Sequence, residues 1–196
     1  MHRRILNMII TFKRINFDHE EIIFKWLSEP HIQEFWDNST AHRDDIINFI
    51  NGRKTPSNYW DGIFEYWIGS ANNIPFSFIM THEEHNDENT PEYIKPYICK
   101  NYRTFGLDFC IGNKKYLGKG LAAKTLKNFM NFFCLNIESN IGTFLIDPST
   151  NNPKAIHVYE KAGFKRKSEF VREAGYFKQD KGVLMVCNTI LEEPRK

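Results

Sequence analysis

The feature that most constrains the fold is an apolar run followed by a glycine-containing loop and a long amphipathic stretch. The run TFGLDFCIG at 104–112 has the residue pattern of a strand. Gly118-Lys119-Gly120 then opens a stretch reaching about Cys134, whose apolar residues at helical spacing are Leu121, Leu126, Phe129, Met130 and Phe133. Another strand, IGTFLID, follows at 141–147. A strand, a helix and a strand in this order predict one parallel crossover within a sheet.

Shorter patterns surround this unit. The other expected strands cover 8–15, 63–69, 75–81, 164–171 and 183–191, and the other expected helices cover 17–27, 43–50 and 154–162. We expect Asp18 to cap the first of these helices and Pro30 to end it. The 196 residues suit one compact domain, residues 1–196. The sequence therefore predicts an α/β fold with a mixed, mostly antiparallel sheet flanked by helices.

Composition excludes several classes of protein. Hydrophobic residues make up 41% and charged residues 26% of the chain, so wholesale disorder is excluded. The 26 basic and 24 acidic residues leave a net charge of +2, which favours neither nucleic acid nor a membrane surface as a partner. No run of 18 apolar residues is present. The four cysteines, at 99, 110, 134 and 187, form no CxxC pair, so we expect reduced thiols in a cytoplasmic protein.

Residues 83–103 break the alternation, since they are rich in Glu, Asn, Pro and Tyr without a sustained period. We expect a long surface loop with at most one helical turn, and either a functional loop or a solvated insertion fits this pattern. The sequence His82-Glu83-Glu84-His85 lacks the spacing of an HExxH zinc motif. We therefore expect no metal site there.

The junction at Gly118 and Gly120 has a chemical interpretation of its own. Two glycines before a helix allow the backbone to approach a ligand and to aim several N–H groups at a phosphate. Neither the P-loop pattern GxxxxGK[ST] nor the GxGxxG dinucleotide pattern is present. A tight turn that only needs glycine remains the alternative.

Residues 146–164, IDPSTNNPKAIHVYEKAGF, combine a strand end, a polar loop and a short helix. Together with the glycine loop, they resemble the GCN5-related N-acetyltransferase (GNAT) superfamily, whose sheet is splayed in the middle to admit acetyl-CoA. The resemblance covers about residues 8–191 and is most specific over 104–164. Within the superfamily the chain is most similar to the aminoglycoside 6'-N-acetyltransferases, through LGKGL at 117–121, DPSxxNxxAIxxYEKAGF at 147–164 and WLSEPHIQEFW at 26–36.

The resemblance implies a set of cofactor-binding residues. The backbone amides of the loop would hold the pyrophosphate of coenzyme A, with the end of the preceding strand and two later side chains completing the site. These residues are Cys110, Ile111, Leu117, Gly118, Lys119, Gly120, Leu121, Asn152 and Tyr159. The family's loop usually starts with Gln or Arg three residues before its first glycine, and Lys115 stands there in this chain.

The resemblance also implies catalytic and acceptor-binding residues. Asp108 would act as a general base, because an aliphatic amine must lose a proton before it attacks an acyl group. Tyr159, similar to the tyrosine near the coenzyme A sulfur, would protonate the leaving thiolate. Trp36, Asp108 and Asp147 would contact the amine substrate, with one further acid among Glu83, Glu84, Asp87 and Glu88, of which we take Glu83. Cys110 is expected to be structural and not a nucleophile.

These expectations describe an acetyl-CoA-dependent N-acetyltransferase without a metal, in which a primary amine of a small polycation attacks directly in a ternary complex. An aminoglycoside 6'-amine is the expected acceptor. A polyamine or a hydroxylysine-type siderophore precursor is the alternative acceptor. A catalytically silent module that binds acyl-CoA is the alternative from another class. The expected partner is a small-molecule amine, and the protein is expected to be a monomer or a homodimer.

Overall fold

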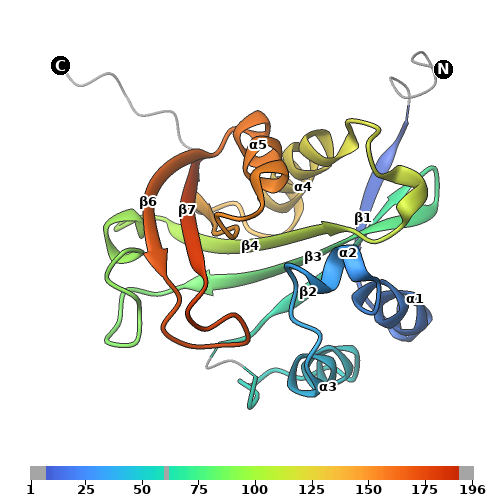
Figure 1. Cartoon of the computed structure of the whole chain (residues 1–196), viewed down its shortest axis with the longest axis horizontal. Coiled ribbons are helices and arrows are strands. Elements are labelled where there is room, and N and C mark those ends of the chain that lie inside the picture. The colour runs from blue at the N-terminus through green and yellow to red at the C-terminus, as the bar shows by residue number, and fades with distance from the viewer. Residues whose placement is uncertain (1–7, 60–61, 190–196) are drawn as a thin grey trace. The chain divides into compact units, whose positions relative to one another are not determined.

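The structure is a computed structural model that describes residues 8–59 and 62–189. These residues form a seven-stranded sheet with the strand order β1-β2-β3-β4-β5-β7-β6 (Figure 1). The strands are β1 (Ile10–Arg14), β2 (Glu65–Ala71), β3 (Ile74–Glu84), β4 (Arg103–Ile111), β5 (Ile141–Ile146), β6 (Lys165–Val171) and β7 (Lys181–Asn188). β4 and β5 pair in parallel, while β1–β2, β2–β3, β5–β7 and β6–β7 pair antiparallel. The predicted mixed, mostly antiparallel α/β fold is confirmed.

The helices are α1 (Phe17–Leu27), α2 (Pro30–Gln33), α3 (Thr40–Ile50), α4 (Leu121–Asn136) and α5 (Pro153–Ala162), with 3-10 turns η2 (Lys95–Tyr97) and η3 (Lys114–Tyr116). The bounds of α1 agree with the sequence, but Asn16 and not Asp18 is its N-cap residue. Pro30 starts α2 at its first position, where a proline has no helical N–H bond to lose. The sequence predicted a break at Pro30 and missed this short helix.

The chain divides into two compact units. The first unit comprises the residues up to Thr81 together with Asp108–Phe129, and the second comprises His82–Leu107 and the residues from Met130 onward. β3, β4 and α4 each pass from one unit into the other. The expected single domain, 1–196, includes terminal residues that lie outside the described ranges.

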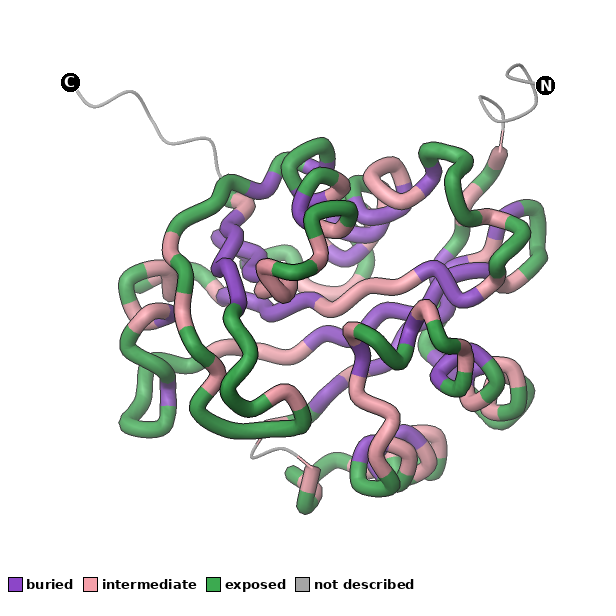
Figure 2. Tube along the Cα trace, in the orientation of Figure 1, coloured by how far each residue is buried: buried purple, intermediate pink, exposed green. Residues whose placement is uncertain are grey.

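The first unit has a core built on α1, α2, α3, β2 and β3. Its largest fully buried side chains include Ile23, Leu27, Ile46, Tyr66 and Phe78. β2 is buried along most of its length (Figure 2). The hairpin between β2 and β3 turns at Asn72 and Asn73, which have φ of 49° and 65°. Positive φ at both central residues is the geometry that favours asparagine in a two-residue hairpin turn.

One cluster of buried residues in the second unit, on β5 and β7, comprises Ile94, Leu145, Leu184 and Val186. Ile94 belongs to the irregular segment 83–103, and the ring of Tyr93 from the same segment stacks on Phe170 with 3.8 Å between centroids. The expected helical turn is present as η2. The part of the segment around Ile94 packs on the core, whereas residues 85–89 are exposed, so a solvated insertion describes only part of the segment. By contrast, the connection between β6 and β7 is mostly exposed (Figure 2).

The parallel pairing of β4 and β5 covers only the first part of β4. It runs from Arg103, opposite Ile141, to Gly106, opposite Leu145, while β4 itself continues to Ile111. The cysteines at 99, 110, 134 and 187 are all free thiols, as the sequence predicts. No helix within the described residues is long and apolar enough to cross a membrane.

Candidate active site

The glycine loop lies between η3 and α4 in the first unit. Gly118 and Gly120 both have φ of 68°, in the left-handed region that favours glycine. A Cβ atom added at either glycine would meet no other atom within 4 Å. The loop therefore presents bare backbone toward open space at the start of a long helix, whose free N–H groups and dipole favour an anion.

The residues that border this loop are anchored. Leu121 begins α4 and is 1% exposed, and its carbonyl accepts a hydrogen bond from Oγ1 of Thr125 at 2.8 Å. Leu117, on the other side of Gly118, is 41% exposed. The ammonium of Lys119 lies 5.7 Å from the ring centroid of Tyr116. The open backbone of the two glycines is thus held between a fixed helix start and a short helical turn.

The last part of β4 carries Asp108, Cys110 and Ile111 in the same unit. Asp108 is half-buried, and its carboxylate helps to raise the pKa of the Cys110 thiol, after the larger effect of burial. Burial likewise raises the pKa of the Tyr59 hydroxyl, with further contributions from Asp37 and Asp108. Because its thiol stays protonated, Cys110 is a poor nucleophile, as the sequence predicts. Tyr59 is a neighbour of Asp108 that the sequence did not reveal.

Trp36 follows α2 and belongs to the core of the first unit. It is 8% exposed, and its ring lies 5.6 Å from that of Phe78. Little of this side chain is therefore accessible to a substrate.

Asn152 and Tyr159 lie in the second unit, on the segment that forms α5. Asn152 is the N-cap residue, and its Oδ1 accepts a hydrogen bond from the N–H of Ala155 at 3.1 Å. Tyr159 is 7% exposed and its ring is tilted against Phe164 at 6.3 Å. Gly163 ends the helix in the left-handed conformation with φ of 112°. Asn152 and Gly163 therefore have structural roles as the residues that begin and end α5, and the ring of Tyr159 packs against Phe164.

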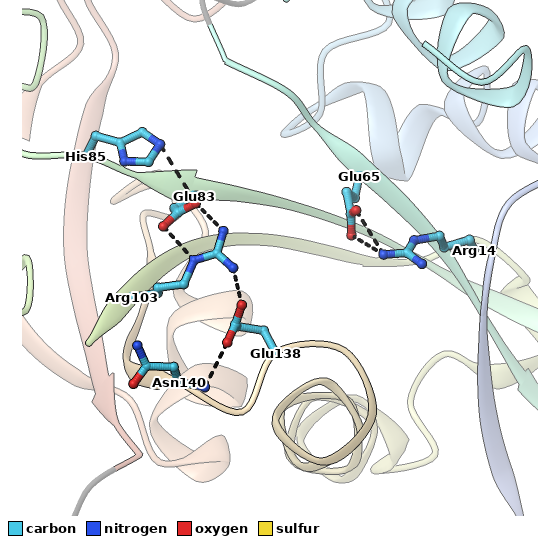
Figure 3. Close-up of polar contacts among 7 residues, drawn as sticks. All are labelled: Arg14, Glu65, Glu83, His85, Arg103, Glu138 and Asn140. Atoms are coloured by element: carbon cyan, nitrogen blue, oxygen red, sulfur yellow. Dashed lines mark hydrogen bonds and ion pairs between the residues drawn. The ribbon is translucent and has the colours of Figure 1, made fainter. Parts of the chain in front are cut away.

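Two of the expected acceptor-binding carboxylates face arginines in the second unit. Oδ2 of Asp147 accepts a hydrogen bond from Nη1 of Arg172 at 2.6 Å. Oε1 of Glu83 accepts one from Nε of Arg103 at 2.7 Å, and Arg103 also pairs with Glu138 (Figure 3). The hydrogen bond from Arg103 holds the pKa of Glu83 below its usual range.

Two further acids of this segment, Glu84 and Asp87, have separate partners, while Glu88 is exposed. Oε1 of Glu84 lies 2.9 Å from Nε2 of His82. Oδ1 of Asp87 accepts hydrogen bonds from the N–H groups of Asn89 and Thr90 at 2.9 and 3.1 Å, which closes a local turn. Among the residues that the structure describes, no group of three or more His, Cys, Asp or Glu side chains is arranged to hold a metal ion.

The comparisons with known proteins agree with this arrangement. Residues 17–172 match the family model of the acetyltransferase (GNAT) domain, and this match runs through both compact units. The chain is 26% identical over 156 residues to the aminoglycoside N(6')-acetyltransferase type 1 of Klebsiella pneumoniae, covering 78% of this chain and 73% of that protein.

Solved structures share the fold. The aminoglycoside N(6')-acetyltransferase of Legionella pneumophila superposes with a TM-score of 0.70 at 26% identity and 91% coverage of both chains. The aminoglycoside acetyltransferase AAC(6')-Ib in complex with coenzyme A and kanamycin has a TM-score of 0.68 at 20% identity, covering 92% of this chain and 95% of that one.

A mixed, mostly antiparallel sheet with a glycine loop at the start of a helix is the arrangement expected of an acetyl-CoA-dependent transferase. The chain belongs to the GNAT acetyltransferase family. It is an N-acetyltransferase.

Proposed function

We propose that the protein transfers the acetyl group of acetyl-CoA to the 6'-amine of an aminoglycoside, and that the whole chain acts as one N-acetyltransferase domain. The observation that carries the proposal is the bare, left-handed backbone of Gly118 and Gly120 at the start of α4, a few residues after Asp108 on β4. Relatives named as aminoglycoside 6'-N-acetyltransferases support the choice of acceptor.

The residues present fit acetyl-CoA. Backbone N–H groups from Leu117 to Leu121 would hold the pyrophosphate, since no side chain fills the space beside either glycine. The backbone of Cys110 and Ile111 would contact the cofactor where β4 extends beyond its pairing with β5. The resemblance to the family also assigns Asn152 and Tyr159 to the cofactor. When bound, the cofactor supplies an acetyl thioester with a thiolate leaving group.

Asp108 would attract the protonated amine and accept its proton, directly or through a water. The neutral amine nitrogen would then attack the acetyl carbon, so that a C–N bond forms as the C–S bond breaks. The hydroxyl of Tyr159 would give its proton to the departing sulfur. The raised pKa of Cys110 argues against an acetylated cysteine as an intermediate and supports direct attack in a ternary complex.

An aminoglycoside carries several ammonium groups, which suits a pocket with several carboxylates. We propose that Asp147 and Glu83, like Asp108 and Trp36, contact the amine substrate. Each of the two already pairs with an arginine. A carboxylate has about four acceptor positions, so each retains the capacity to accept a hydrogen bond from an ammonium group.

The test is an amine panel assayed by release of the coenzyme A thiol. Kanamycin- and tobramycin-type amines are compared with spermidine and N6-hydroxylysine at low and high salt. We expect the aminoglycosides to be acetylated most efficiently, with kcat/KM falling as salt screens the carboxylates. Asp108→Asn should lower kcat/KM by about 100-fold, because a general base commonly contributes that much, while the affinity for acetyl-CoA is kept.

Other outcomes would change the assignment. Efficient turnover of N6-hydroxylysine or spermidine without aminoglycoside acetylation would change the assigned acceptor. The assignment of the cofactor site would stand. Binding of coenzyme A without turnover of any amine would indicate a silent acyl-CoA-binding module.

A further inference from the structure

Residues Ile111–Lys114 connect the end of β4 to the turn before the glycine loop, and they are tied down on two sides. On one side, the N–H groups of Gly112 and Asn113 both donate to the carbonyl of Phe76, at 2.9 and 3.1 Å. These bonds continue the backbone pairing of the sheet in the first unit. The direction in which the chain leaves β4 therefore depends on contacts to this short segment.

On the other side, the segment meets three side chains from the region of α1 and α2, which we call the β4-end clamp: Trp26, Glu29 and His31. A Cβ at Gly112 would lie 2.0 Å from Cδ2 of Trp26, so the glycine rests directly on the indole. Nζ of Lys114 lies 2.5 Å from Oε2 of Glu29. Nε2 of His31 lies 3.3 Å from the carbonyl oxygen of Ile111.

The hydrogen bond of His31 has a defined direction. A carbonyl oxygen can only accept, so Nε2 must carry the proton and donate it. Nδ1 of the same ring is buried and has no hydrogen-bond partner among the described residues, so the bond to Ile111 is the hydrogen bond that the structure gives this ring. The next residue, Ile32, is 3% exposed and packs in the core of the first unit, which anchors the backbone beside His31.

We propose that His31 is a positioning residue of the acetyl-CoA site. By donating to the carbonyl of Ile111, it fixes the end of β4 and thereby the point from which the chain turns toward Gly118 and Gly120. The inference rests on the proposed function, since it assumes that this loop holds the cofactor. His31 acts through the backbone of Ile111 and not on the reacting atoms.

Two substitutions of similar length separate hydrogen bonding from packing. His31→Gln places an amide donor near the position of Nε2, and His31→Met fills similar space without a donor. We expect His31→Met to raise the KM for acetyl-CoA and the Kd for coenzyme A by about 3- to 10-fold, the value of one lost hydrogen bond. His31→Gln should keep both within about 2-fold, and the KM for the amine at saturating acetyl-CoA should not change in either variant.

The exposed His157 of α5 offers a matched control. His157→Met removes a histidine of the same chain and should leave the Kd for coenzyme A unchanged. Thermal unfolding of the free proteins is measured in parallel, because a purely structural role would lower the Tm of His31→Met without weakening coenzyme A binding. If His31→Met does not fold, His31→Asn replaces it, since its shorter amide does not reach the position of Nε2.

Equal coenzyme A affinity in wild type, His31→Gln and the folded donor-free variant would overturn the inference. Equal loss in the Gln and donor-free variants would also overturn it, because packing would then be the cause. A wild-type protein that does not bind coenzyme A would contradict the proposed function instead, so the two failures are distinguishable.

Discussion

Two glycine positions in the first unit, fewer than ten residues apart, are used for opposite physical reasons. Gly112 has φ outside the left-handed region, and its Cα rests on the indole of Trp26. Gly120 has φ of 68° and faces open space. A side chain at position 112 would clash with the indole of Trp26, whereas a side chain at position 120 would extend into open space. The first glycine serves packing, and the second leaves room for a ligand.

This difference explains how a loop can be open and still be placed accurately. The segment before it is fixed by the β4-end clamp and by the two bonds to Phe76, and the segment after it is fixed by the buried Leu121. Preorganised backbone between two fixed ends binds an anion without first losing much conformational freedom. The comparison predicts that substitutions at the two glycines damage different properties.

The largest expected effect is the loss of coenzyme A binding in Gly120→Val. The valine side chain would fill the space beside the loop backbone and prevent two or more N–H groups from binding phosphate. We therefore expect the affinity for coenzyme A to fall by at least about 100-fold. The protein should still fold, because the left-handed backbone costs a non-glycine residue only about 1–2 kcal/mol. Calorimetry with coenzyme A and urea unfolding measure the two effects.

Gly52→Val is the matched control for this prediction. Gly52 also has positive φ, 82°, and a Cβ there would also meet no atom within 4 Å. It follows α3 and lies outside the proposed site, so the variant should show a similar loss of stability with normal coenzyme A affinity. Unchanged affinity in a folded Gly120→Val protein would remove the phosphate-binding role of the loop.

The next effect is on stability, in Gly112→Ala. The added methyl must displace the indole of Trp26 or the end of β4, and overpacking of this kind costs about 1–3 kcal/mol. The clash should be relieved when Trp26 is made smaller, so Trp26→Leu is combined with Gly112→Ala in a double-mutant cycle of urea unfolding. We expect a coupling energy of about 1 kcal/mol or more for this pair, since residues in contact are not additive.

Gly118→Ala in the same Trp26→Leu background supplies the comparison. Its cost comes from backbone conformation and not from a contact, so it should be the same with either residue at position 26. Additive costs for Gly112→Ala and Trp26→Leu would show that the contact with the indole does not explain this glycine.

The sequence predicted the elements whose patterns are long and local. The apolar stripe of α4, the crossover into β5 and the segment that forms α5 all lie close to their expected bounds. α2 was missed because four residues are too few to show a helical period. β3 extends to Glu84, beyond its expected end, because pairing within the sheet continues the strand after its apolar pattern has stopped. Residues 190–191 of the last expected strand lie outside the described residues.

The parts of the candidate site that depend on local backbone conformation could be predicted from the sequence. The contacts between side chains far apart along the chain could not. Two glycines this close together, Gly118 and Gly120, indicate a left-handed backbone conformation from residue type alone, because other residues rarely adopt it. The arginines that face Glu83 and Asp147 are 20 and 25 positions away along the chain, and no local pattern links them. His31 and the carbonyl of Ile111 are 80 positions apart, and only the folded chain shows that they meet.

The smallest expected effect concerns the ion pair of the β4-end clamp. The side chains of Glu29 and Lys114 are 25% and 58% exposed, so solvent and salt screen their attraction. Glu29→Gln should therefore lower the urea midpoint only slightly and change the Kd for coenzyme A by less than about 2-fold. Glu92→Gln, which removes a more exposed pair with Lys95, is the control for a surface ion pair in the second unit.

The pH dependence of this small effect has a definite sign. The hydrogen bond from Lys114 holds the pKa of Glu29 below its ordinary value of 4.5. A carboxyl group whose pKa is lower in the folded state stabilises the protein above its unfolded pKa, and this contribution disappears as the pH falls through the folded pKa. The difference in urea midpoint between wild type and Glu29→Gln should thus be largest at neutral pH and low salt and should vanish below the lowered pKa. A loss of stability in Glu29→Gln as large as that in Gly112→Ala would mean that charge, and not the packing of Trp26 on Gly112, holds the end of β4.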